Sequence, residues 1–284
     1  MRQPKRPSAD YSKGFSLLEL LAVVAVIGIL AALLLPALSQ ARQRVTMVSC
    51  LGNLGELGTA AAMYSVDYHE SLPANGVGTP GIQLDSIPPT FVPKYWVEGR
   101  EGGNFLDRTA NSIVNEKVSL LAPYIRERGS FRCPGDTYSQ RISGVLLANP
   151  RNYALNAFVG WVGAPINGQG DDSKFEIFEA ASDVPQPDSI FSFGEIHPMS
   201  ICQPFFGVHM QVLDGAYHVP GNYHGRFSNF AFLDGHIERH RWVSSSFNSP
   251  EYAGDWHKAH VTGLPGTDSK PDLAWLSQHA SVKK

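Results

Sequence analysis

One apolar run near the N-terminus dominates the hydrophobic pattern of the chain. It extends from Phe15 to Leu38 (FSLLELLAVVAVIGILAALLLPAL), and Glu19 is its only formally charged residue. A helix of this length reaches roughly 36 Å at about 1.5 Å per residue, which is enough to cross a hydrocarbon core of roughly 30 Å with some tilt. The pattern predicts a membrane-spanning helix over residues 15–38.

Two other interpretations of this run stay open. A secretory signal peptide would have a shorter apolar region followed by a small-residue cleavage site, for which Ala31-Ala32 or Pro36-Ala37-Leu38 are the available positions. A buried core helix is disfavoured, because runs of this length without polar interruption are rare in soluble cores. We prefer the membrane-spanning helix.

Apolar residues recur every three or four positions after this run, which is the period of an amphipathic helix. They are Leu38, Ala41, Val45, Val48, Leu51, Leu54, Leu57, Ala61, Tyr64 and Tyr68. The spacing predicts one helix over residues 15–68, roughly 80 Å long, whose second half is covered by a soluble domain. Within that half, Gly52, Gly55 and Gly58 are expected to mark close backbone packing.

Strand signals, in which apolar and polar residues alternate, gather in the C-terminal half. The predicted strands are Ser189–Glu195, Phe205–Val212, Ser228–Leu233 and His236–Val243, and their succession predicts an antiparallel meander.

The last two predicted strands are joined by Asp234-Gly235, a dipeptide that suits a two-residue type I′ turn. Such a turn places Phe232 opposite Ile237 and Phe230 opposite Arg239. Phe230, Phe232 and Ile237 then share one face of the hairpin. We expect that face to pack on the second half of the long helix.

Proline and glycine clusters from Ser71 onward end the helix and predict a loop-rich head. A short helix is expected over Val118–Glu127, and a mobile loop over Gly160–Ser173. The predicted organisation is a leader over residues 1–14, the spanning helix over 15–38, its amphipathic continuation over 39–70, and a globular α+β head with an antiparallel sheet over 71–284.

The net charge argues against nucleic-acid binding, and the distribution of charge predicts the orientation in the membrane. Charged residues make up 17% of the 284, the formal net charge is −3 and the pI is near 6.4, so there is no overall basic field of the kind that nucleic-acid binding usually needs. Residues 1–14 carry a net charge of +3, from four basic residues and one acidic residue. The positive-inside rule therefore keeps the leader in the cytoplasm and places everything after residue 38 outside it.

The residues at the start of the apolar run form a specific motif. Lys13-Gly14-Phe15, followed by Glu19, resembles the processing site of the type IV pilin and pseudopilin family. The resemblance implies cleavage after Gly14 by a prepilin peptidase, N-methylation of Phe15, and a Glu19 that neutralises the N-terminus of a neighbouring subunit during assembly. Such pairing removes the cost of isolated charges in lipid. The alternative is that Glu19 merely snorkels to the headgroups.

A second resemblance lies in the C-terminal half. His224 and Asp234-Gly235 have the spacing H-x9-DG of a pilin-like family with the same kind of N-terminus, and Asn152–Asn156 (NYALN) is similar to a segment of that group. The resemblance implies a pilin-like fold, in which the long N-terminal helix packs against a C-terminal antiparallel sheet.

Five imidazole and carboxylate groups invite a metal interpretation, since both are good ligands for zinc-like ions: His218, His224, Asp234, His236 and His240. Their spacing matches no zinc pattern, and His236 and His240 are too far apart along a strand to share one ion. We prefer hydrogen-bonded or exposed histidines and predict no metal. For calcium, Asp171-Asp172 and Asp214-Gly215 are the nearest candidates, and both are weak.

Three cysteines are too few for a dense disulfide scaffold, but they lie beyond the membrane, where disulfides are permitted. A bridge from Cys50 to Cys133 would tie the long helix to the turn at Pro134, with Cys202 left free. The alternative is three separate buried thiols that act as small hydrophobic side chains.

No catalytic motif stands in the chain, so we predict no enzyme and no cofactor. The preferred function is a pilin-like or pseudopilin subunit of a type II secretion or type IV pilus-like system. Its expected partners are prepilin peptidase, other pilin-like subunits, the inner-membrane assembly platform and membrane lipid. It would sit in the cytoplasmic (inner) membrane with a single pass and an extracytoplasmic head, within a periplasmic or cell-surface filament.

Two other function classes are kept. The first is a single-span envelope protein whose head binds a glycan or protein without polymerising. The second is a membrane-tethered His/Asp metalloenzyme, for which the sequence lacks the convergent groups that a catalytic site needs.

Overall fold

The computed structural model describes residues 16–76, 95–97, 113–142, 145–162, 174–198, 200–201, 204–210, 216–248 and 269–284. The chain divides into two compact units, Met1–Val45 and Thr46–Lys284, which are described separately. The predicted leader and most of the loop predicted over Gly160–Ser173 lie outside the described residues.

The first unit consists, in its described part, of the start of helix α1 (Leu17–Asp67). Helix α1 is long and apolar enough to cross a membrane, and no residue of its most apolar segment is buried among the residues that the structure describes. Leu17, Leu33 and Leu35 are 83%, 71% and 66% exposed. Helix α1 continues without interruption through Pro36, so the predicted long helix is confirmed.

Helix α1 begins and ends with recognisable caps. Ser16 Oγ accepts a hydrogen bond from the Leu18 backbone N–H (3.3 Å), and Glu19 Oε2 accepts one from the Ser16 N–H (2.9 Å). The first bond satisfies an N–H of the first helical turn, as an N-cap side chain does, and the second brings the Glu19 carboxylate back to the N-cap N–H. At the other end, His69 and Glu70 take positive φ angles of 55° and 66°, which an α-helix cannot continue through.

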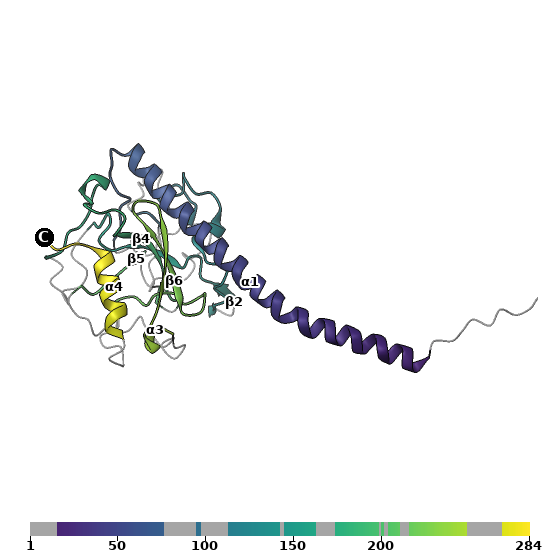
Figure 1. The fold of residues 1–284 in the computed structure, drawn as a ribbon. Helices are drawn as coiled ribbons and strands as arrows, with labels where there is room; N and C mark the ends of the chain where they lie inside the picture. The colour runs from purple at the N-terminus through teal and green to yellow at the C-terminus, as the bar shows by residue number, and fades with distance from the viewer. Residues whose placement is uncertain are drawn as a thin grey trace, which may run out of the picture. The chain divides into compact units, whose positions relative to one another are not determined.

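The second unit is built on a five-stranded sheet with the order β5-β3-β4-β6-β7. Its strands are β3 (Tyr153–Asn156), β4 (Phe191–Glu195), β5 (Phe205–Phe206), β6 (Phe227–Phe232) and β7 (Ile237–Arg241). All neighbours are antiparallel except β3 and β5, which are parallel. The predicted meander is therefore wrong: β5 is short and lies at one edge of the sheet, and β3 separates it from β4. Figure 1 shows β4, β5 and β6 within the head.

The turn between β6 and β7 is also different from the predicted one. Ala231 pairs with Ile237 and Phe230 with Glu238, one residue away from the expected register. The loop has three residues and ends in Gly235, whose φ of 94° favours glycine. This is the type I turn with a G1 bulge that three-residue hairpin loops adopt.

The one-residue shift changes which side chains of β6 share a face with Ile237, because neighbouring side chains of a strand point to opposite faces. Ala231 and Ile237 lie on the α1 side, where a Cβ at Gly58 would be 3.9 Å from Ala231 Cβ. Phe230 and Phe232 point the other way. The expectation that these two phenylalanines pack on the long helix is therefore wrong.

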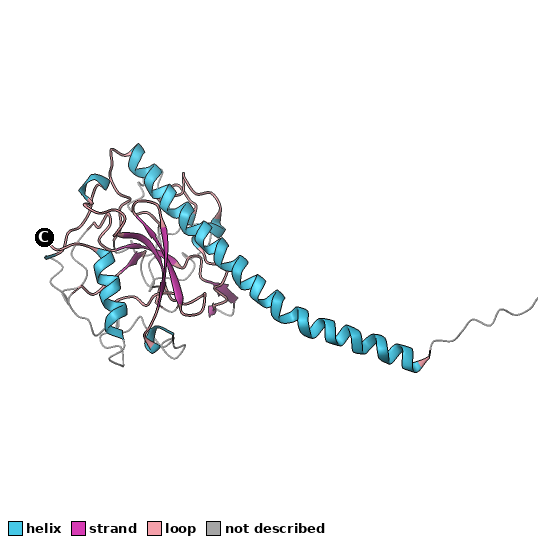
Figure 2. Cartoon of the chain, viewed as in Figure 1, coloured by secondary structure: helices cyan, strands magenta, loops and turns pink. Residues whose placement is uncertain are grey.

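Two hydrophobic cores lie on the two faces of the sheet (Figure 2). On one face, the second part of α1 buries Leu54 and Leu57 against the sheet. On the other face, helix α4 (Lys270–Ala280) buries Leu273 and Leu276 beside Phe230. The head is therefore a helix, sheet, helix arrangement of the α+β class.

The remaining elements are short: strands β1 (Ser139–Ile142) and β2 (Val145–Ala148) form a two-stranded sheet, and the short helices are η3 (Arg128–Phe131), η5 (Ala181–Asp183) and α3 (Ser245–Asn248). The helix predicted over Val118–Glu127 is instead a succession of turns that precedes η3. Proline at position 123 lacks the N–H that a continuous helix would need there.

Candidate functional site

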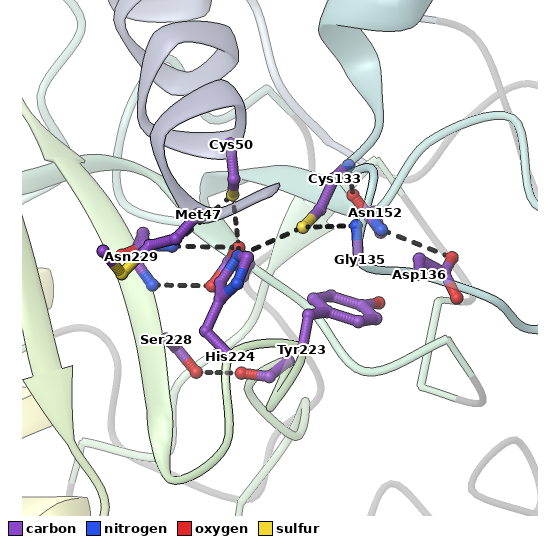
Figure 3. A network of polar contacts seen from close by, with 12 residues as sticks. Met47, Cys50, Cys133, Gly135, Asp136, Asn152, Tyr223, His224, Ser228 and Asn229 are labelled. Atoms are coloured by element: carbon purple, nitrogen blue, oxygen red, sulfur yellow. Dashed lines mark hydrogen bonds and ion pairs between the residues drawn. The ribbon is translucent and has the colours of Figure 1, made fainter. Parts of the chain in front are cut away.

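Four side chains from four separate segments meet inside the head. Figure 3 labels Cys50, Cys133 and His224 among them. Cys50 lies on α1, Cys133 follows η3, Glu195 is the last residue of β4, and His224 precedes β6. Their Sγ, carboxylate and imidazole atoms all lie within 4.8 Å of one another. We call these four residues the Cys/His/Glu cluster.

Strand geometry brings Glu195 to the helix side of the sheet. Glu195 pairs with Tyr153 across the antiparallel ladder of β3 and β4, so both side chains lie on the same face. Tyr153 donates a hydrogen bond from its hydroxyl to Cys50 Sγ (3.0 Å). On β6, Asn229 lies on this face too, two residues before Ala231, and its backbone N–H donates to Glu195 Oε2 (2.7 Å).

Loops bring in the other two members. The Cys133 N–H donates to Asn152 Oδ1 (2.7 Å), and the Gly135 N–H donates to Cys133 Sγ (3.3 Å), so backbone bonds orient the thiol. His224 stands next to Gly225, whose φ of 78° turns the chain toward β6.

The contacts inside the cluster are short. Cys50 Sγ lies 2.6 Å from Glu195 Oε1, His224 Nε2 lies 3.3 Å from the same oxygen, and Cys133 Sγ lies 3.2 Å from His224 Nε2. Cys50, Cys133 and Glu195 have no exposed surface, and the His224 side chain is 5% exposed.

Burial and mutual contact shift the acidities of these groups in different directions. Burial raises the pKa of the Cys50 thiol, and the neighbouring Cys133 and Glu195 raise it further. The contacts of Cys133 with Cys50 and then His224 lower the pKa of the Cys133 thiol to about 7, against the opposing effect of burial. Burial alone would lower the pKa of His224, but hydrogen bonds with Cys133 and Glu195 outweigh it and raise the pKa to about 10.

The cluster revises the predicted disulfide. Cys50 and Cys133 are adjacent, as the prediction required, but both are free thiols in the structure. A carboxylate and an imidazole lie against the two sulfurs, an arrangement that the sequence analysis did not consider. The bridge between Cys50 and Cys133 stays a prediction. Cys202 lies outside the described residues.

The H-x9-DG residues take two different places. His224 belongs to the cluster, whereas Asp234 and Gly235 form the β6–β7 turn. Asp234 Oδ1 accepts a hydrogen bond from the His236 N–H (3.0 Å) and lies 2.6 Å from His236 Nδ1. These interactions lower the pKa of Asp234, although burial opposes the shift.

The other histidines considered as metal ligands have separate surroundings. His218 Nδ1 accepts a hydrogen bond from the Gly207 N–H (2.9 Å), and His240 Nε2 lies 3.6 Å from Asp272 Oδ1. Of the groups considered for metal, His224 alone belongs to the cluster within the described part of the chain. Asp171-Asp172 and Asp214-Gly215 lie outside the described residues.

Sequence reasoning did not single out Glu195. The sequence feature that could have indicated it is a carboxylate at the end of a strand whose other residues are apolar or small (FSFGE). Glu195 is fully buried, and a buried charged group needs a partner. Two thiols, an imidazole and a carboxylate are donors that zinc uses in proteins. Cys133 and His224 also form a thiol–imidazole pair, in which the Cys133 sulfur is buried.

The predicted processing site begins just before the described residues. Lys13, Gly14 and Phe15 lie outside them, so their role stays a prediction. Glu19 is described, and its carboxylate accepts a hydrogen bond from the Ser16 N–H at the start of α1.

Comparison with known proteins identifies one family model, the prokaryotic N-terminal methylation motif, which matches residues 10–35. Searches of curated proteins and of solved structures found no significant match. The matched residues contain Lys13-Gly14-Phe15, Glu19 and most of the apolar run. The N-terminus of this chain therefore carries the cleavage and methylation motif of type IV pilin-like proteins.

Proposed function

We propose that the protein is a pilin-like or pseudopilin structural subunit that is processed by prepilin peptidase and assembled into an envelope filament. The observation that carries this proposal is the methylation motif at residues 10–35, directly at the start of an exposed apolar helix. A helix without covering side chains needs lipid or the helices of other subunits around it. The membrane surrounds the helix with lipid before assembly, and a filament surrounds it with the helices of other subunits afterwards.

Glu19 has a specific part in this proposal. In the precursor its carboxylate accepts the Ser16 N–H, which satisfies one of the unpaired amide groups at the helix start. Cleavage after Gly14 creates an ammonium group on Phe15, about one helical turn from Glu19. The carboxylate then has a charged partner available, on its own chain or on a neighbour, and this reduces the cost of a charge in lipid.

The proposed location follows from the same features. The basic leader keeps the start of the chain in the cytoplasm, so the helix anchors the protein with a single pass and the head lies outside the cytoplasm. The expected partners are prepilin peptidase, other pilin-like subunits, an inner-membrane assembly platform and lipid. The role is structural, and a type II secretion pseudopilus or a type IV pilus-like fibre would use it in the same way.

Processing is tested by replacing Gly14 with Val in cells that express the prepilin peptidase. A bulky side chain should block the close backbone approach that a protease cleft requires, so the variant should keep its leader. Intact mass should show that the wild-type chain has lost residues 1–14 and gained one methyl group. The control is Gly28→Ala, because Gly28 lies in the same helix with open space around its Cβ position.

Gly28→Ala should be processed like the wild type. A wild-type chain that retains Met1, or that is cut near Ala37, would contradict the pilin-like function and favour a plain anchor or a secreted protein. A Gly14→Val chain that still begins at Phe15 would contradict the role assigned to Gly14.

A further inference from the structure

We propose that the Cys/His/Glu cluster binds one zinc-like divalent ion, which ties α1 to the sheet and loops of the head. The proposal is independent of filament assembly, because it concerns residues of the second unit only. Neither the methylation motif nor its match assigns a metal to the chain.

The donor set is the first argument. Structural zinc sites use four ligands in tetrahedral geometry, drawn from Cys, His and carboxylate groups. The cluster offers one ligand atom from each of Cys50, Cys133, His224 and Glu195, all within 4.8 Å of one another. Thiolate and imidazole ligands together favour zinc over magnesium or calcium, which prefer oxygen.

The distances are the second argument. Bonds of about 2.0 to 2.3 Å in a tetrahedron separate neighbouring ligand atoms by about 3.3 to 3.8 Å. The separations of 3.2 Å (Cys133 to His224) and 3.3 Å (His224 to Glu195) are close to this range. Cys50 Sγ and Glu195 Oε1 lie closer, at 2.6 Å, so a bound ion requires the carboxylate to move by about 1 Å.

The surroundings of the ligands are the third argument. Metal ligands are usually held by an outer shell of hydrogen bonds. Tyr153 OH and Asn229 Nδ2 donate to Cys50 Sγ (3.0 and 3.4 Å), and the Gly135 N–H donates to Cys133 Sγ (3.3 Å). Donors aimed at sulfur stabilise a thiolate, which is the form that binds a metal.

Burial is the fourth argument. The ligands come from segments far apart in the sequence, and all of them are inside the head. A buried carboxylate and two buried thiols are costly to collect unless they bind something together. On binding, the thiols and the protonated imidazole of His224 release their protons to solvent, and the ion replaces those protons as the group that holds the cluster together.

The test uses the full chain without a histidine tag, purified in detergent and kept reduced. We expect one equivalent of zinc by elemental analysis, and a dissociation constant below about 1 µM in competition with a chromogenic chelator. Cobalt(II) should replace zinc and give a thiolate-to-cobalt charge-transfer band with tetrahedral ligand-field bands.

Matched variants assign the ligands. Cys133→Ser and His224→Gln should each weaken zinc binding by at least about 100-fold, because loss of an outer-shell partner alone already costs about 10- to 100-fold. His236→Ala is the control, since His236 pairs with Asp234 at the exposed turn. It should bind zinc like the wild type. If a ligand variant does not fold, the cobalt spectrum of the wild type shows whether thiolate and imidazole ligands bind the metal.

Three results would overturn the proposal. The first is a reduced wild-type chain that binds no zinc. The second is metal binding in which cobalt gives no thiolate-to-cobalt charge-transfer band, or in which Cys133→Ser leaves the zinc affinity unchanged. The third is a Cys50–Cys133 disulfide recovered by non-reducing mass mapping of protein isolated from the envelope. Each can occur whether or not the leader is cleaved, so failure here is separate from failure of the pilin-like function.

Discussion

At the residue scale, two glycines of the head occupy positions where a residue with a Cβ would be strained. Gly160 has a φ of 63°, and a Cβ added there would collide with the Pro73 carbonyl. Gly235 has a φ of 94°, but open space surrounds its Cβ position. Both residues occupy the left-handed region that L-residues avoid, and Gly160 also lies in contact with a neighbouring backbone.

This difference gives a paired prediction. Gly235→Ala should lower the free energy of unfolding of the head by about 1 to 2 kcal/mol, the cost of the left-handed conformation alone. Gly160→Ala should cost at least about 1 kcal/mol more, because the Pro73 backbone must also move. Denaturant unfolding followed by near-UV circular dichroism measures both. Equal losses in the two variants would show that the contact with Pro73 contributes nothing.

At the element scale, the glycines in the second half of α1 have room for a methyl group. A Cβ at Gly58 would be 3.9 Å from Ala231 Cβ, and one at Gly55 would be 3.5 Å from Ile237 Cδ1, which are ordinary packing distances. Gly52 has nothing within 4 Å. The expected close backbone packing is therefore limited to ordinary van der Waals contact at Gly55 and Gly58, and it does not apply to Gly52.

These distances predict that Gly58→Ala stabilises the head by up to about 1 kcal/mol, through higher helix propensity without a clash. Gly52→Ala is the control that measures propensity alone, and it should give a similar gain. Gly58→Leu should instead destabilise by about 1 to 3 kcal/mol, since extra methylene groups must enter the contact with Ala231. Thermal unfolding of the three variants, compared with wild type, tests the series. A loss in Gly58→Ala would mean that α1 lies closer to the sheet.

A β-bulge between Phe191 and Phe193 changes which face of the sheet the side chains of β4 reach. The register of β4 against β6 shifts there, and Phe191 joins the α4 core whereas Phe193 joins the α1 core. Residues two apart in a regular strand would share a face. The bulge therefore lets β4 contribute an aromatic side chain to each core, while Glu195 stays on the α1 side.

At the scale of the whole molecule, insertion in the membrane and assembly into a filament place different demands on Glu19. Glu19→Leu makes the helix more apolar, so insertion should be kept; a central carboxylate costs roughly 2.5 to 3.5 kcal/mol on translocon scales, whereas Leu is mildly favourable. Assembly should fall, because the substitution removes the partner of the Phe15 ammonium group. Crosslinking of adjacent subunits through cysteines engineered along α1 measures assembly in both proteins.

The outcomes of that experiment separate the two function classes. Crosslinking that is lost only in Glu19→Leu supports the pairing role. Equal crosslinking in both proteins would refute that role. Absence of crosslinking in both would favour a solitary anchored protein whose head binds a glycan or protein without polymerising.

The sequence alone determined the apolar anchor, the processing motif, the long helix and the α+β class. These are local properties, since a run of leucines and valines is apolar in any context, and a period of three to four residues persists from Leu38 to Tyr68. Caps and glycine turns are local too, so the hairpin at Asp234-Gly235 was predicted even though its register was wrong by one residue.

Tertiary structure decided the rest. The strand order places β3 between β4 and β5, and no periodicity in the sequence encodes that neighbour relation. The three-residue loop that ends at Gly235 puts Ile237 on the opposite face of the sheet from Phe230. The bulge in β4 puts Phe191 on the opposite face from Phe193. The cluster depends on long-range packing, because Cys50, Cys133, Glu195 and His224 meet only once the helix, the sheet and two loops are folded together.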